Sequence, residues 1–134
     1  MRVTIDTNVF LSAVTDRNPR QRERAVALFH AAAGGEASIV IPQSIVFEIA
    51  YVLSSVYKRD AATIRAMLGD LAAVPGVEIV DELRFGSWIE LWARHFPDPT
   101  DAAVAAVAME TGSTVATFDR KFARRLEAVG VARW

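Results

Sequence analysis

Near its start the chain reads Val3-Thr4-Ile5-Asp6-Thr7-Asn8, a short β-branched run that ends at an acidic residue. β-Branched residues favour extended backbone, so residues 3–5 are predicted to form a strand that stops at Asp6. The run Val115-Ala116-Thr117-Phe118 repeats this arrangement and is followed at once by Asp119. If the two strands are parallel neighbours, both carboxylates emerge at the same edge of the sheet, where open α/β sheets hold their functional sites. An ordinary turn or cap is the alternative role for either residue alone.

Strands and helices are predicted to alternate along the whole chain. The apolar spacing and the Gly, Pro and Asn breaks predict strands at residues 3–5, 37–41, 77–80 and 113–118, with a short fifth near Val131, and helices at residues 20–33, 44–57, 61–73, 84–94, 101–111 and 120–128. Residues 8–14 fit either a helix or a loop. Ser44, Asp60 and Thr100 are the expected N-caps of three of these helices. Alternation of this kind is typical of a parallel sheet with helices on both faces.

The composition limits the class of protein. With 134 residues, of which 52% are hydrophobic, the chain fits one domain, residues 1–134, with enough apolar material for a packed core. It has no cysteine, which excludes disulfides, zinc–thiolate sites and cysteine nucleophiles. Asp6 interrupts the apolar run that a signal peptide needs, and no apolar stretch is long enough to span a bilayer, so we expect a soluble cytoplasmic protein. The net charge of −1 argues mildly against a nucleic-acid binder, which is usually basic.

Glu48 stands alone in an apolar helix. It is the only charged residue between Pro42 and Lys58, and no Lys or Arg lies within a helical turn of it. An apolar helix is normally buried, and a buried carboxylate without a partner is costly. We therefore expect a metal, a cation or strong hydrogen bonds at Glu48. A Glu on a narrow solvated stripe is the alternative.

Asp101 opens an alanine-rich sequence, Asp101-Ala-Ala-Val-Ala-Ala-Val-Ala. The free N–H groups of a helix N-terminus favour an acid there, and this role competes with a functional one. The small alanine side chains would let the helix pack closely on the sheet and hold the acid at its edge. Asp98, three residues earlier, is either a further, more peripheral acid or part of an Asp-Pro turn.

Carboxylates gathered in this way have a narrow chemistry. They repel one another unless a cation lies between them, and hard divalent ions such as Mg²⁺ or Mn²⁺ prefer carboxylate oxygen. A metal so held can activate a water and stabilise the leaving oxygen of a phosphodiester. His30 and His95 lie outside these motifs and are expected to be ordinary surface or core residues.

The order and spacing of these motifs resemble the PIN-domain nucleases. The shared motifs are Ile5-Asp6-Thr7-Asn8, the lone Glu48 in its apolar helix, the alanine-rich sequence from Asp101, and Thr117-Phe118-Asp119-Arg120-Lys121-Phe122. Together they span essentially the whole chain, and they look most like the VapC toxins of bacterial and archaeal toxin–antitoxin pairs. The resemblance implies a three-layer α/β/α fold with a five-stranded parallel sheet of order 3-2-1-4-5.

The resemblance also implies an activity, which is metal-dependent endonucleolytic cleavage of RNA with Mg²⁺ or Mn²⁺ as the cofactor. The four acids of the family match Asp6, Glu48, Asp101 and Asp119. Glu48 would bind the metal directly or through water. Asn8 and Thr117 match polar residues that orient ligands or water around the metal. Asp98 lies outside the usual four and is an additional candidate ligand.

Two protein partners are implied as well: a second copy of the chain in a homodimer, and a cognate antitoxin whose peptide covers the active site. Trp88 and Trp92 are four residues apart and share a helix face, which would serve either interface or the core. The RNA itself would need a basic surface. Arg20, Arg22 and Arg24 are the candidates, although a solvated helix face is the usual role of such a run.

Three other interpretations fit parts of the sequence. A phosphatase of the HAD type also begins with a strand that ends in Asp, but it needs a second acid where this chain has Asn8. A signal-receiver domain shares the alternating pattern but has paired acids and a late Lys after a strand, which this chain lacks. The third is a module of the same fold that binds RNA or protein without cutting, and the complete set of four acids argues against it.

Overall fold

The computed structural model describes residues 1–80, 84–117 and 119–133. The chain divides into two compact units, Met1–Val80 and Asp81–Trp134. Each unit has its own helices and its own buried residues. The expectation of one domain over residues 1–134 stays a prediction.

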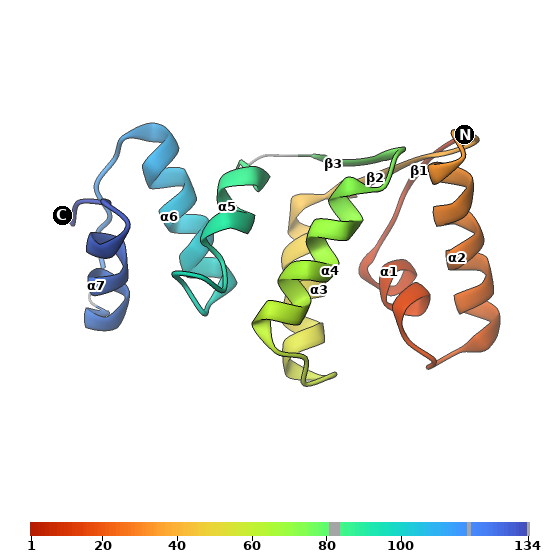
Figure 1. The fold of residues 1–134 in the computed structure, drawn as a ribbon, viewed down its shortest axis with the longest axis horizontal. Coiled ribbons are helices and arrows are strands. Elements are labelled where there is room, and N and C mark those ends of the chain that lie inside the picture. The colour runs from red at the N-terminus through yellow and green to blue at the C-terminus, as the bar shows by residue number, and fades with distance from the viewer. Residues whose placement is uncertain (81–83, 118, 134) are drawn as a thin grey trace. The chain divides into compact units, whose positions relative to one another are not determined.

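The first unit contains a parallel sheet of three strands, β1 (Arg2–Thr4), β2 (Ser38–Pro42) and β3 (Val77–Val80), in the order β1-β2-β3 (Figure 1). Thr4 pairs with Val40 in the register of β1 and β2, and the N–H of Ile5 donates to the carbonyl of Val40 at 3.1 Å. This order matches the 3-2-1 half of the expected sheet. Because the strands are parallel, the carboxyl ends of β1 and β2 lie at one edge, and Asp6 follows β1 there.

Four helices complete this unit: α1 (Thr7–Val14), α2 (Pro19–Ala33), α3 (Gln43–Ser55) and α4 (Ala61–Ala73). Residues 8–14, which fitted a helix or a loop, thus belong to a helix. The Asp60 carboxylate caps α4 as predicted, since it accepts from the N–H of Thr63. The expectation that Ser44 caps its helix is wrong: the extended residue Pro42 occupies the cap position, and Ser44 lies inside α3.

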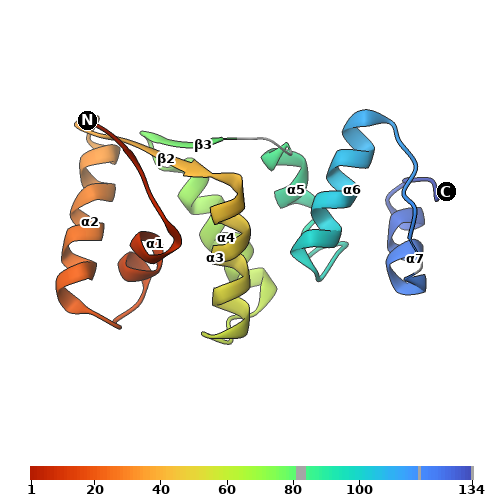
Figure 2. The ribbon, with the colours of Figure 1, turned by 180° about the vertical axis from the view of Figure 1, so that it is seen from behind.

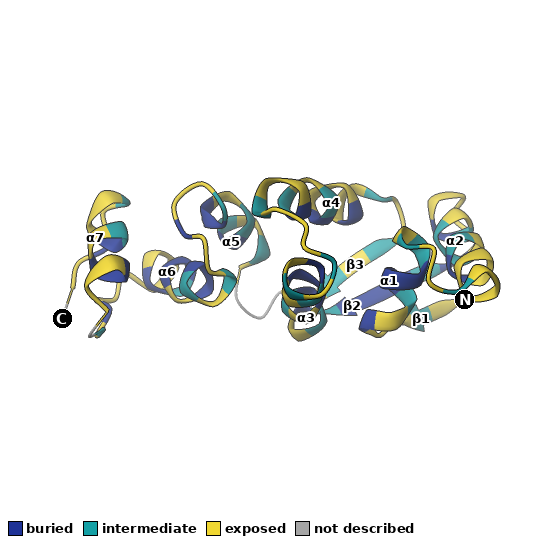
Figure 3. Cartoon of the chain, turned by 90° about the horizontal axis from the view of Figure 1, so that it is seen from below, coloured by how far each residue is buried: buried dark blue, intermediate teal, exposed yellow. Residues whose placement is uncertain are grey.

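The core of the first unit is aliphatic. Helix α3 buries Val46, Ile49, Ala50 and Leu53 on one face and leaves its opposite face exposed (Figure 3). This face packs beside β2, in which Ile39 and Ile41 are fully buried. Burying each such side chain contributes about 1.5–3 kcal/mol, so this face fixes the orientation of α3.

The second unit contains α5 (Phe85–Leu91), α6 (Pro99–Thr111) and α7 (Arg120–Ala128) (Figure 2). The helix expected at residues 84–94 ends early because Trp92 is extended, with ψ 143°, and Ala93 has φ 66°. The expected cap Thr100 is also wrong: Asp98 caps α6, and Pro99 occupies its first turn. None of the helices within the described ranges has the length and apolar character needed to cross a membrane.

The strand expected at residues 113–118 is present only as an isolated parallel bridge between Val115 and Arg133. The N–H of Val115 donates to the carbonyl of Ala132 at 2.9 Å. Phe118, which the prediction included, lies outside the described residues. The described sheet therefore has three strands, and the five-stranded order stays a prediction.

Aromatic residues form the core of the second unit. Trp88 and Trp92 stack with ring centroids 5.4 Å apart and an interplanar angle of 10°, and both are buried. Their indole N–H groups donate to backbone carbonyls, that of Trp88 to Pro99 at 2.9 Å and that of Trp92 to Pro97 at 3.3 Å. Of the two roles that the sequence left open for this pair, the structure assigns the core.

Gly76 is the glycine on which the first unit depends most. Its φ is +79°, and an added Cβ would lie 2.5 Å from the carbonyl oxygen of Ala32. Gly76→Ala should therefore lower the free energy of unfolding by about 2–4 kcal/mol, from backbone strain and steric overlap together. Urea denaturation would show a lower midpoint at an unchanged slope.

Gly69→Ala is the matched control, since Gly69 lies in α4 and nothing would approach its Cβ within 4 Å. This change should leave the free energy of unfolding unchanged or raise it by about 1 kcal/mol, because Ala favours helix more than Gly. Equal midpoints for the two variants would contradict the importance of Gly76.

Candidate functional site

Asp6 is placed by both the sheet and a helix. It lies two residues after the end of β1 and is the N-cap of α1, where its Oδ1 accepts from the N–H of Val9 at 3.1 Å. The side chain is exposed. The cap hydrogen bond uses one carboxylate oxygen, and no hydrogen bond within the described residues reaches the other. Asp6 can therefore cap α1 with one oxygen and still bind a ligand with the other.

Glu48 is exposed on α3, which corrects the expectation that it is buried in an apolar environment. Residues 46, 49, 50 and 53 form the buried face of the helix, and Glu48 lies opposite them. It still has a specific partner, because the buried hydroxyl of Thr7 donates to its Oε2 at 2.7 Å. Thr7 is adjacent to Asp6 in sequence, so this hydrogen bond brings Glu48 to the same edge of the first unit.

Asn8 is held by an arginine that the sequence analysis did not single out. Arg17 Nη2 donates to Asn8 Oδ1 at 2.9 Å, to the Asn8 carbonyl at 3.3 Å and to Ser12 Oγ at 3.2 Å. The buried hydroxyl of Ser12 in turn donates to Gln21 Oε1 at 3.3 Å. This network links α1 to α2. The sequence patterns of α1 and α2 do not predict this network, because its residues come together only after the chain turns at Asn18-Pro19.

A cavity of about 450 Å³ lies beside Asp6 between α1 and α2. Its polar lining consists of Asp6, Asn8, Ser12, Gln21 and Arg24. Of the three arginines predicted to contact RNA, Arg24 lines this cavity, while Arg22 forms an ion pair with Asp16 at 3.1 Å. Arg20 is exposed and lies outside the cavity lining.

In the second unit, Asp98 and Asp119 are both N-caps. Asp98 Oδ1 accepts from the N–H groups of Thr100 and Asp101 at 2.8 and 3.0 Å. Asp119 Oδ1 accepts from those of Lys121 and Phe122, also at 2.8 and 3.0 Å. Thr117 lies beside the second cap, because its Oγ1 accepts from the N–H of Asp119 at 3.1 Å.

The pKa of Asp101 is raised above its ordinary value. Burial of the carboxylate is the main cause, followed by repulsion from Asp98 and from Asp119, while Arg125 opposes the shift. Asp98 and Asp119 thus both lie close enough to Asp101 for their charges to act on it. Repulsion among them is what a bound cation would relieve.

The pKa of Asp119 is lowered. The backbone N–H of Phe122 is the main cause, and the N–H of Lys121 and the charges of Arg125 and Lys121 act in the same direction. Asp119 therefore stays ionised at more acidic pH than Asp101 does. Two carboxylates of one unit thus differ in how readily they give up their protons.

The four predicted acids are divided equally between the two units. Asp6 and Glu48 belong to the first, and Asp101 and Asp119 belong to the second. Among the residues that the structure describes, no group of three or more His, Asp or Glu side chains is arranged to hold a metal ion. The convergence of all four acids on one metal site stays a prediction.

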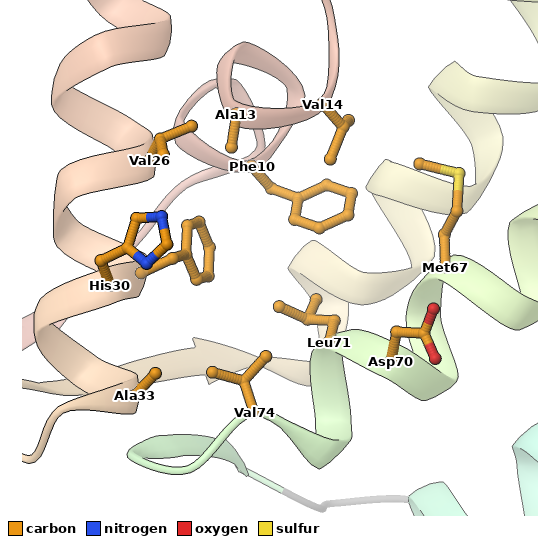
Figure 4. Close-up of a pocket in the computed structure, with 11 residues that line it drawn as sticks. Phe10, Ala13, Val14, Val26, His30, Ala33, Met67, Asp70, Leu71 and Val74 are labelled. Carbon is orange, nitrogen blue, oxygen red and sulfur yellow. The ribbon is translucent and has the colours of Figure 1, made fainter.

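A second cavity, of about 430 Å³, lies between α1, α2 and α4 and is mostly apolar (Figure 4). Phe10, Met67 and Leu71 are among the side chains that line it, and Asp70 is its one acidic residue. None of the four predicted acids lines it. It is therefore separate from the candidate site.

Comparison with known proteins adds three findings. The family model described as "PIN domain" matches residues 3–126. No curated protein matches the chain. A solved structure, of VapBC2 from Rickettsia felis bound to a DNA fragment from their promoter, is similar over 100% of this chain and 99% of that one, with 16% sequence identity and a TM-score of 0.40.

The two pKa shifts give a test on the metal-free protein. Asp101 should titrate above an ordinary aspartate and Asp119 below it, and Asp119→Asn should lower the pKa of Asp101 because one repelling charge is removed. Acidification through the pKa of Asp119 should therefore weaken the cap of α7, whereas protonation of Asp101 relieves repulsion. Carboxyl-carbon NMR during a pH titration measures both groups, and a lower pKa for Asp101 than for Asp119 would refute the proposed clustering of charge.

Proposed function

Because the chain belongs to the PIN-domain family, whose model matches residues 3–126, we propose that it is a metal-dependent endoribonuclease. PIN domains are generally nucleases. The chain has an acid at each of the four positions that the family motifs define: Asp6, Glu48, Asp101 and Asp119. The proposal includes RNA as the substrate and a divalent metal ion as the cofactor.

One observation carries the proposal. Hydrogen bonds fix one oxygen of Asp6, of Glu48 and of Asp119, and none within the described residues reaches the second oxygen of these three carboxylates. A ligand whose orientation is fixed in this way loses little freedom when it binds a metal. This donor set fits Mg²⁺ or Mn²⁺, which prefer carboxylate oxygen.

We assign Asp6, Asp101 and Asp119 as the nearest metal ligands and Glu48 as a ligand that binds directly or through water. Asp98 is an additional candidate, since its charge already acts on Asp101. A divalent ion held there supplies Lewis acidity, which makes water a stronger nucleophile and stabilises the leaving oxygen of the phosphodiester. The chain's own contribution is to orient these oxygens: Thr7 holds Glu48, and Thr117 supports the backbone of Asp119.

The partners are proposed from the same sequence resemblance. A VapC-type toxin would act in the cytoplasm, form a homodimer and be inhibited by a cognate antitoxin. Arg20, Arg22 and Arg24 are proposed RNA contacts, and Arg24 is the one that lines the cavity beside Asp6. The second candidate function is a module that binds RNA or protein without cutting.

Cleavage of RNA by the purified protein tests the activity. Wild type should cut a mixed pool of structured RNA with Mg²⁺ or Mn²⁺ and not with EDTA. Asp6→Asn and Asp119→Asn should each lower the rate roughly a hundredfold or more, because the metal loses a charged ligand. Asn caps helices as well as Asp does, so both variants should keep their folds.

Asp60→Asn is the matched control, since Asp60 caps α4 in the same way and belongs to no predicted site. It should cleave like wild type. Undiminished cleavage by the Asp6 and Asp119 variants would overturn the assignment. RNA binding by wild type with no cleavage under either metal would favour the non-cutting module.

The Thr7–Glu48 hydrogen bond gives a second prediction. Thr7→Val keeps the side-chain shape but removes the hydroxyl that holds Glu48, so Mn²⁺ affinity should fall about tenfold. Thr7→Ser keeps a hydroxyl and should stay near wild type. Isothermal titration with Mn²⁺ measures both, and equal affinities for wild type and the Val variant would remove Thr7 from the site.

A further inference from the structure

We infer that the cavity between α1 and α2 is a subsite for a phosphodiester group of RNA, beside the bond that is cut. The inference rests on the proposed function, and it adds a place for the substrate that the four acids do not supply. Three side chains carry it: Asn8 on α1, and Gln21 and Arg24 on α2.

The acceptor atoms of the cavity's amide side chains already have donors. Asn8 Oδ1 accepts from Arg17 at 2.9 Å, and Gln21 Oε1 accepts from Ser12 at 3.3 Å. The NH₂ groups of Asn8 and Gln21 have no hydrogen-bond acceptor within the described residues. Each amide therefore keeps donor hydrogens that no described residue uses, on a residue that lines the cavity.

Arg24 adds a cation to these donors. It is exposed on the cavity wall, and it has no ion pair among the residues that the structure describes. The nearby Arg22 forms an ion pair with Asp16, and Arg20 lies outside the cavity lining. A guanidinium with two amide donors suits the oxygens of a phosphate, which accept hydrogen bonds and carry charge.

The position of Asp6 indicates which phosphate of the RNA would bind here. It lines the same cavity and is a proposed metal ligand, so a group bound at Arg24 lies next to the proposed reaction centre. About 450 Å³ is within the range of small-ligand sites and suits one nucleotide unit. Arg24 would bind the phosphate that flanks the cut bond. A substitution of Arg24 should therefore change substrate binding more than the rate of the chemical step.

The first experiment measures binding of a random single-stranded 12-nucleotide RNA pool by fluorescence anisotropy in an Asp119→Asn background, in which cleavage is expected to be strongly slowed. Arg24→Gln should weaken binding about tenfold, the effect expected when a charge-assisted hydrogen bond is lost. Arg24→Lys should recover part of the loss, since it keeps the charge but not the planar fork. Arg59→Gln, with the same change of charge at an exposed residue outside the proposed site, should have a much smaller effect.

The second experiment follows backbone amides by NMR while a 5′-mononucleotide, inorganic phosphate or the matching nucleoside is added to the wild type. Shifts in α1 and α2 with either phosphate-bearing probe, absent with the nucleoside, would support the subsite. Equal shifts with the nucleoside would overturn it. Equal losses of RNA affinity for the Arg59 and Arg24 variants would also overturn it, since non-specific attraction to positive charge would explain them.

Failure of the nuclease proposal can be distinguished from failure of the subsite proposal. If wild type cuts no RNA but Arg24→Gln still weakens binding selectively, the subsite stands in a non-cutting protein. If wild type cuts RNA, Arg24→Gln should raise KM about tenfold and leave kcat near wild type. A loss in kcat with KM unchanged would remove Arg24 from substrate binding.

Discussion

The hydrogen bonds from helix N-terminal N–H groups to aspartate oxygens are the constraint on which the candidate site depends. Asp6, Asp98 and Asp119 each begin a helix, and each accepts at least one N–H from its first turn. The positive end of the helix dipole favours the charge, and the hydrogen bond fixes the carboxylate. The same bonds that start these helices therefore engage one oxygen of each carboxylate, and no hydrogen bond among the described residues reaches the other.

Elements set by local signals could be predicted from the sequence. The bounds of α4, its cap Asp60 and the bounds of β3 agree with the prediction because a cap or a Pro-Gly break marks them. The predicted caps Ser44 and Thr100 failed for a local reason. Two residues before each, Pro42 and Asp98 already have the extended backbone of a cap, so the helices begin earlier.

Features that depend on distant residues could not be predicted in this way. An apolar stretch around Glu48 indicated burial, but helical geometry places Glu48, like Tyr51, on the side of α3 away from the buried face. Its partner Thr7 is 41 residues away, and no spacing rule connects them. The network through Arg17 and Ser12 is of the same kind. The proposed convergence of the four acids involves residues of both units, and local patterns carry no information on contacts between distant segments.

The proposed double role of the capping aspartates, as helix caps and as metal ligands, also bears on how such a protein can evolve. Asparagine caps a helix about as well as aspartate does, and one nucleotide change in the codon converts one into the other. The step would remove a proposed metal ligand while the helix start and the core stay intact. Descendants that keep the surface but have lost the chemistry are therefore one mutation away, with almost no barrier in folding, and they would persist wherever binding alone is useful.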